Sequence, residues 1–140
     1  MRVLAVAAVL GVLCFGCAPT RSVEAFCATY HDEKAAFIDK YNERQDAVDS
    51  MEGLDGIVLG LGSAIEAVGD TKVMFDKLEA VAPEEIQADV AAVRDSLQQQ
   101  LEAAGEVASD PFGAFGSGLV SGLASMGSWD RVDHYIQENC

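Results

Sequence analysis

The chain has 140 residues, and its 23 acidic against nine basic side chains give a formal net charge of −14 at pH 7. This charge argues against nucleic acid as a partner, because phosphate binding requires clustered lysine and arginine, and equally against docking on anionic lipid head groups. Half of the residues are hydrophobic, and no linker or low-complexity tract divides the chain. The composition therefore predicts one globular domain that its charge keeps soluble.

The first 16 residues are typical of an export signal. Arg2 supplies a positive start, an uncharged apolar run extends from Val3 to Phe15, and small residues follow. This order is that of a targeting segment rather than of a structural element. The run is also shorter than the roughly 20 apolar residues of a membrane-spanning helix. We therefore expect residues 1–16 to be removed and the remaining chain to work outside the cytoplasm.

The segment from Leu13 to Cys17 resembles a bacterial lipoprotein signal, in which a small residue, here Gly16, precedes the modified cysteine. The resemblance implies cleavage before Cys17, acylation of that cysteine and a short tether over residues 17–21. Several acyl chains would hold the protein on the extracytoplasmic face of the cell membrane, because each buried CH₂ contributes about 0.8 kcal/mol. The first alternative is cleavage after Ala18, which gives a secreted soluble protein, and the second is an uncleaved leader.

Two cysteines remain once Cys14 leaves with the signal and Cys17 carries the lipid, namely Cys27 and Cys140. In an oxidising compartment such a pair is most simply interpreted as one disulfide. It would close a loop of more than a hundred residues, which the chain-entropy model values at about 4–5 kcal/mol. The alternative is two free thiols or two metal ligands.

Apolar residues follow a helical spacing throughout the mature chain, and no segment alternates over strand lengths. A first helix should begin after the N-cap Ser22 and end near Gly53. Another should begin at Pro83, where acids follow the proline, and end at Gly105. We expect an all-α fold over residues 22–140, a compact bundle of four to five antiparallel helices stapled by the Cys27–Cys140 disulfide.

Two expected helices are rich in small residues. In the second, Gly56, Gly60 and Ala64 share one face, which lets another backbone approach closely although each helical glycine costs about 1 kcal/mol. A break is expected near Gly69-Asp70. The uncharged segment from Pro111 has a similar face, and Ser128 should cap a separate short helix from Trp129 to about Asn139. We expect the two glycine-bearing helices to pack closely against each other or against the first helix.

The sequence contains no nucleophile–base pairing or other catalytic pattern, so it predicts neither an enzyme nor a cofactor. Helices without bulky side chains can leave a groove for a small apolar ligand, although tight backbone packing is the default. The residues expected to line such a groove are Leu61, Ile65, Phe115, Leu119 and Leu123. His31 and His134 are weak candidates for metal ligands, because a disulfide removes Cys27 as a third ligand, and both are simply interpreted as surface histidines.

Four segments carry a wider resemblance: Ser22 to Cys27, Val73 to Leu78, Ala82 to Ile86, and Tyr135 to Cys140. With them the mature chain is similar to small exported lipoproteins of unknown function found among actinobacteria. The resemblance implies a compartment and an architecture and no activity. We therefore expect a membrane-tethered accessory or interaction module with an unknown protein partner. The alternative is a carrier or sensor of a small apolar ligand held between the glycine-bearing helices.

Overall fold

The computed structural model describes residues 20–51, 53–106, 109 and 111–140, without the side chains of 111–115, 117 and 119. The described chain is all-helical, as expected. Its elements in chain order are α1 (Val23–Asp49), α2 (Leu54–Val81), α3 (Glu84–Glu106) and α4 (Pro111–Asn139). Four helices lie within the predicted number of four to five. The predicted signal, residues 1–16, and the predicted lipid site Cys17 lie outside the described residues. Of the predicted tether, residues 17–21, the structure describes only residues 20 and 21.

The helix starts predicted after Ser22 and at Pro83 are confirmed. Ser22 caps α1, and its hydroxyl oxygen accepts a hydrogen bond from the Ala25 amide at 3.1 Å. This bond satisfies one of the amides that have no partner within the first helical turn. At the start of α3 the Pro83 carbonyl accepts from the amides of Ile86 and Gln87 at 3.1 and 3.0 Å. Proline fits there because its missing N–H would have no helical partner in any case.

The predicted break near Gly69-Asp70 is wrong, because α2 runs without interruption through both residues. Contacts on two sides support the helix at this point. The Asp70 carboxylate accepts hydrogen bonds from Lys40 at 2.8 Å and Arg44 at 2.5 Å, both on α1. On the other side, a Cβ at Gly69 would lie 4.0 Å from the Leu101 side chain of α3. Packing against two neighbours therefore outweighs the weak helical propensity of glycine.

The separate short helix from Trp129 is also wrong, since α4 continues from Pro111 to Asn139. Ser128 is buried within this helix, and its hydroxyl accepts a hydrogen bond from Arg131 at 3.2 Å. Two serines that precede Ser128 on the same face of α4, Ser121 and Ser125, are buried as well. Continuous contact with α3 along this small polar face keeps the glycine-rich segment helical.

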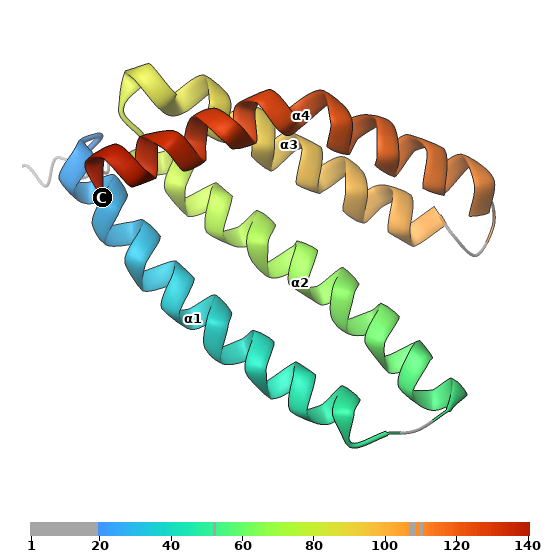
Figure 1. The fold of residues 1–140 in the computed structure, drawn as a ribbon. Coiled ribbons are helices and arrows are strands. Elements are labelled where there is room, and N and C mark those ends of the chain that lie inside the picture. The colour runs from blue at the N-terminus through green and yellow to red at the C-terminus, as the bar shows by residue number, and fades with distance from the viewer. Residues whose placement is uncertain (1–19, 52, 107–108, 110) are drawn as a thin grey trace, which may run out of the picture.

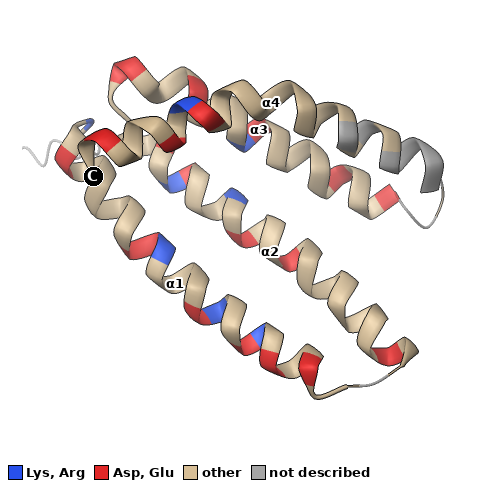
Figure 2. Ribbon diagram, in the orientation of Figure 1, with Lys and Arg blue, Asp and Glu red and all other residues tan. Residues whose placement is uncertain are grey.

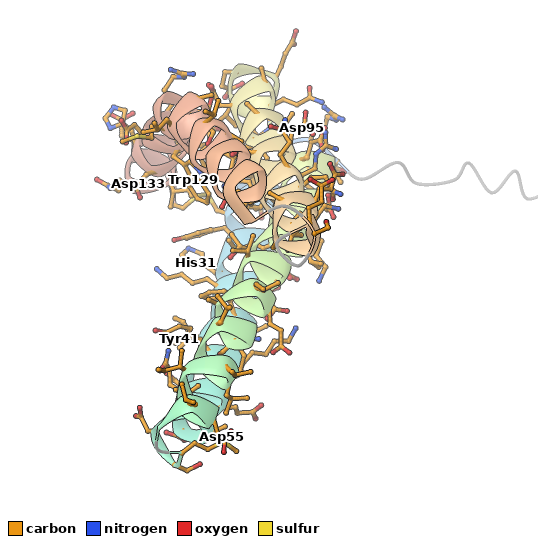
Figure 3. All side chains as sticks on the ribbon, turned by 90° about the vertical axis from the view of Figure 1, so that its right-hand side faces the viewer. His31, Tyr41, Asp55, Asp95, Trp129 and Asp133 are labelled. Carbon is orange, nitrogen blue, oxygen red and sulfur yellow. A yellow bond between two sulfur atoms is a disulfide. The ribbon has the colours of Figure 1, made fainter. Side chains whose placement is uncertain are left out.

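The four helices form two antiparallel hairpins, α1–α2 and α3–α4, which are joined at one end, with α3 lying along α2 (Figure 1). α2 packs on both α1 and α3, and α4 packs mainly on α3. The core therefore gathers at the shared end, where α2 passes into α3. Beyond this end α3 stays packed along α2 as far as Leu101 and Ala104, which line a cavity with Ile65 and Val68. The outer part of the α1–α2 hairpin projects beyond α3 (Figure 3). The buried core consists of Phe26, Phe75, Leu78, Ala82, Ile86, Val90, Val93, Leu97 and Val132.

Aromatic contacts and the predicted disulfide join the two hairpins at the shared end. The ring of Phe75 on α2 meets Trp129 on α4 edge to face, with centroids 5.0 Å apart. Phe26 and Tyr135 make a similar contact at 5.6 Å. Cys27 and Cys140 are bonded, with their Cα atoms 5.2 Å apart, which confirms the expected pairing. The start of α1 is thus fixed to the end of α4.

Candidate interaction surface

α2 carries a row of bulky apolar side chains that point into solvent. The row follows the three- and four-residue spacing of a single helix face. Leu54 is 79% exposed, Leu61 is 62% exposed, and Ile65, nearest the core, is 38% exposed. Exposed apolar patches of this kind usually mark a binding surface. The residues of the row, which we call the α2 apolar row, are Leu54, Ile57, Val58, Leu61 and Ile65.

The α2 apolar row continues the buried interface between α2 and α3. Inward from Ile65 the same face carries Val68, which packs against the core. Ile65 and Val68 line a cavity with Leu101 and Ala104 of α3. Farther out the α1–α2 hairpin projects away from α3 and α4, as the position of Asp55 in Figure 3 shows. The row is therefore an extension of a core interface beyond the helix that covers its inner part.

The row points outward because small residues fill the seam between α1 and α2. A Cβ at Gly60 would lie 3.9 Å from the Val48 side chain of α1, and one at Gly56 would lie 3.1 Å from the Met51 carbonyl oxygen. The predicted small-residue face of α2 is thus turned to the first helix, one of the two expected partners. Bulky residues on other faces, such as Leu54 and Leu61, are then left outside the seam.

The α3–α4 hairpin is built in the same manner. Its seam contains Ser96 of α3, whose hydroxyl donates to the Ser121 carbonyl at 3.0 Å and accepts from Ser125 at 2.9 Å. A Cβ at Gly118 would lie 4.0 Å from Ala103 of α3. The expectation that the second glycine-bearing helix packs on the first helix or on its glycine-bearing counterpart is therefore wrong. Among the described side chains of α4, the large apolar ones left exposed are Val120, Leu123 and Met126.

The residues predicted to line an apolar groove come from these two separate hairpins. Ile65 borders a cavity of about 140 Å³, but its other wall is α3 rather than α4. Small-molecule pockets generally measure about 300–1,000 Å³, so this cavity is smaller than an acyl-chain site requires. Leu61 and Leu123 are exposed, and the side chains of Phe115 and Leu119 lie outside the described residues. The predicted ligand groove stays a prediction.

Basic residues are absent from the outer half of the α1–α2 hairpin. Residues 45–71 contain no lysine or arginine, and Figure 2 shows only acidic positions toward the hairpin end. The structure describes five acids in this stretch. Asp70 is ion-paired, but the other four form no ion pair with any described residue. These four acids are Asp46, Asp49, Asp55 and Glu66. The outer end of the hairpin therefore carries uncompensated negative charge, whereas Glu66, nearer the core, lines a groove with Lys40, Arg44 and Lys72.

Six basic residues nearer the shared end are held in ion pairs, namely Lys40, Arg44, Lys72, Lys77, Arg94 and Arg131. A hydrogen bond from Lys40 is the main cause of a lowered pKa at Asp70, and Arg44 adds to it. In the same way Arg131 lowers the pKa of Asp89, to which it donates from Nε at 2.9 Å. Lys40, Arg44 and Asp70 line an open groove of about 620 Å³ between the helices. Both basic side chains are bound to the Asp70 carboxylate there. The paired charges stabilise the fold and leave the row as the candidate site.

The two weak metal candidates lie apart from other ligand-type side chains. His31 is exposed and lies beside Tyr30, with ring centroids 5.4 Å apart. The Nε2 atom of His134 lies 3.2 Å from Glu138, one turn along α4. Within the described ranges no three histidine, cysteine, aspartate or glutamate side chains gather as a metal site would require. Both histidines sit on the surface.

Comparison with known proteins identifies no relative: no family model, no curated protein and no solved structure matches this chain. For the helices that the structure describes, none combines the length and apolarity needed to cross a membrane. Sequence reasoning named Leu61 and Ile65 as groove residues and missed Leu54, Ile57 and Val58 as an outward surface. The signal was present in the spacing, because these residues share a face that differs from the glycine face.

Proposed function

We propose that this chain is an extracytoplasmic lipoprotein, tethered to the membrane through Cys17, that acts as a non-enzymatic interaction module. The observation that carries the proposal is the α2 apolar row, whose outer members are among the most exposed large apolar residues of the protein. An apolar surface kept in water on an otherwise strongly charged protein is best explained by a partner that covers it. The resemblance to small exported actinobacterial lipoproteins is consistent with this role.

The Cys27–Cys140 disulfide supports an oxidising compartment, because such bonds persist mainly outside the cytoplasm. The geometry also suits a tethered module. A tether over residues 17–21 would span at most about 18 Å. α1, with 27 residues, extends roughly 40 Å from the attached end. The hairpin would thus present the row well away from its attachment point.

A partner helix on the row would complete the compact bundle that the sequence predicts. The inner part of the α2 face is covered by α3, whose Leu101 and Ala104 lie against Ile65 and Val68. A second helix placed on Leu54 to Leu61 would continue this cover along the hairpin. It would remove apolar surface from water, with about 25 cal/mol gained for each Å².

The anchor is tested by acylation. Cells grown with radiolabelled palmitate should incorporate the label into the wild-type chain and fractionate it with membranes. The Cys17→Ser variant should incorporate none. An unlabelled wild-type protein released into the medium would instead establish the secreted form.

The interaction role is tested by cross-linking in intact cells. A photoreactive amino acid at position 61 should give discrete adducts, because the row is then covered by its partner. The same amino acid at Asp133, an exposed position on α4, is the matched control and should give none. Equal labelling at both positions, or none at position 61, would contradict the proposal.

A further inference from the structure

We propose that the α2 apolar row binds a cationic amphipathic helix of a partner protein, an inference that rests on the proposed interaction role. Two independent observations carry it: the exposed apolar row itself and the acidic charge at the outer end of the hairpin, where residues 45–65 contain no lysine or arginine.

The row has the form of one half of a helix–helix interface. Its members recur at three- and four-residue intervals from Leu54 to Ile65, which is the spacing by which amphipathic helices dock in grooves. The stretch is about 17 Å long at 1.5 Å per residue. A partner helix of about three turns would match it. The exposed fraction falls from Leu54 to Ile65, so the row also has a polarity that runs from the tip toward the α3 contact.

The charge around the row determines the partner's chemistry. Asp55 and Glu66 lie on α2 beside the row, and Asp46 and Asp49 lie on α1 at the same end. These four side chains make no ion pair with any residue in the described part of the chain. Charges at the rim of an interface steer complementary partners and repel like-charged ones. Lysine or arginine beside the apolar face of the partner would meet these carboxylates.

The same charges disfavour the two other occupants. A second copy of this chain, packed antiparallel on the row, would bring Asp55 of one copy toward Glu66 of the other, and like charges at close range are destabilising. A membrane with anionic lipids would repel the hairpin, because surface attraction to such lipids needs basic residues. A basic helix is the occupant that satisfies both the apolar and the acidic features.

The test uses a fluorescein-labelled helical peptide of leucine, alanine and lysine, with leucine at the i, i+3, i+4 and i+7 positions and lysine on both flanks. Two matched peptides replace every lysine by glutamine or by glutamate. Each is titrated with the full, disulfide-bonded chain at physiological ionic strength, and binding is followed by fluorescence anisotropy. Helicity and thermal melting of each protein variant are recorded first, and we expect Leu61→Glu to keep the fold because Leu61 is 62% exposed.

The lysine peptide should bind, and Leu61→Glu should weaken binding at least tenfold although it adds a negative charge. Met126→Glu, at a comparably exposed position on α4, adds the same charge away from the row and should leave binding unchanged. Neutralising Asp55 or Glu66 by the corresponding amide should weaken binding about two- to fivefold, as expected for exposed ion pairs.

Several results would overturn the inference in distinguishable ways. Undiminished binding to Leu61→Glu would show that charge alone attracts the peptide. Leu61-dependent binding of the glutamine or glutamate peptide as tight as that of the lysine peptide would refute the cationic partner and leave the interaction role standing. Leu61-dependent dimers in sedimentation, or Leu61-dependent binding to phosphatidylcholine vesicles, would assign the row to a second copy or to lipid. If no peptide, vesicle or second copy binds, the interaction role fails as well.

Discussion

Replacing both Cys27 and Cys140 by serine is expected to lower the free energy of unfolding by about 5 kcal/mol. The disulfide closes a loop with a sequence separation of 113 residues. In the chain-entropy model a loop of this length removes about 16 cal/mol/K from the unfolded chain, equivalent to about 4.8 kcal/mol at 25 °C. Single domains are generally stable by only about 5–15 kcal/mol. The double variant should therefore lie close to the limit of folding.

The structure also predicts where the loss is felt first. Besides the disulfide, the start of α1 and the end of α4 are joined mainly through the buried Phe26 and its contact with Tyr135, whose ring centroids lie 5.6 Å apart. Without the bond the last turns of α4 should separate from α1 before the rest unfolds. Amide hydrogen exchange should therefore accelerate most around Tyr135 and least in the middle of α3.

Urea denaturation followed by circular dichroism measures the effect. Both proteins should carry Cys14→Ser and Cys17→Ser, so that the only difference is the Cys27–Cys140 pair. The dependence of unfolding free energy on urea should also steepen in the variant, because an uncrosslinked unfolded chain exposes more surface. A loss below about 1 kcal/mol with an unchanged slope would refute the entropic reasoning.

Three further predictions concern the core, the charges and the glycines. Phe75→Ala, at a side chain 2% exposed, should lower the free energy of unfolding by about 3–5 kcal/mol in the same urea assay, and a loss under about 1 kcal/mol would show that Phe75 is not a core residue. Hydrogen bonds from Arg131 lower the pKa of Asp89 from its ordinary value of 3.8. Asp89 thus stabilises the fold above that value and loses this contribution as the pH falls through its folded pKa. Urea midpoints measured down to about pH 3 should therefore fall more for the wild type than for Asp89→Asn, and parallel curves would contradict this. Gly62→Ala should raise the Tm, because a Cβ there meets nothing within 4 Å and alanine is the better helix former. Gly53→Ala should lower the Tm, because Gly53 has a φ of 73° that disfavours a side chain, and the opposite order of these two variants would refute both arguments.

Local signals in the sequence were sufficient for the helix starts and for the disulfide. Ser22 and Pro83 act through hydrogen bonds within three or four residues, so their effect is visible without knowledge of the fold. Cys27 and Cys140 were paired by setting aside Cys14 of the expected leader and Cys17 as the expected lipid site, and the expected oxidising compartment supplied the chemistry. Each inference depended on few residues.

The errors arose where distant segments decide the outcome. The break expected at Gly69 was prevented by contacts from α1 and α3 on either side of α2, and no local pattern reveals them. Spacing placed Leu61 and Ile65 on one face, but it could not tell whether a helix of the same chain covers that face. Gly60, which lies at the interface between α1 and α2, determines which face of α2 is exposed. Its close approach to Val48 turns the bulky face of α2 away from α1.

The closed ring formed by residues 27–140 has a mechanical consequence. If the membrane holds the N-terminus and a partner holds α2, tension between them reaches residue 58 by two covalent routes, one along α1 and one through the disulfide into α4. The shorter route contains roughly 30 residues, which limits any extension to about 110 Å even after complete unravelling. Most of the α3–α4 hairpin would therefore carry little force while the chain is pulled.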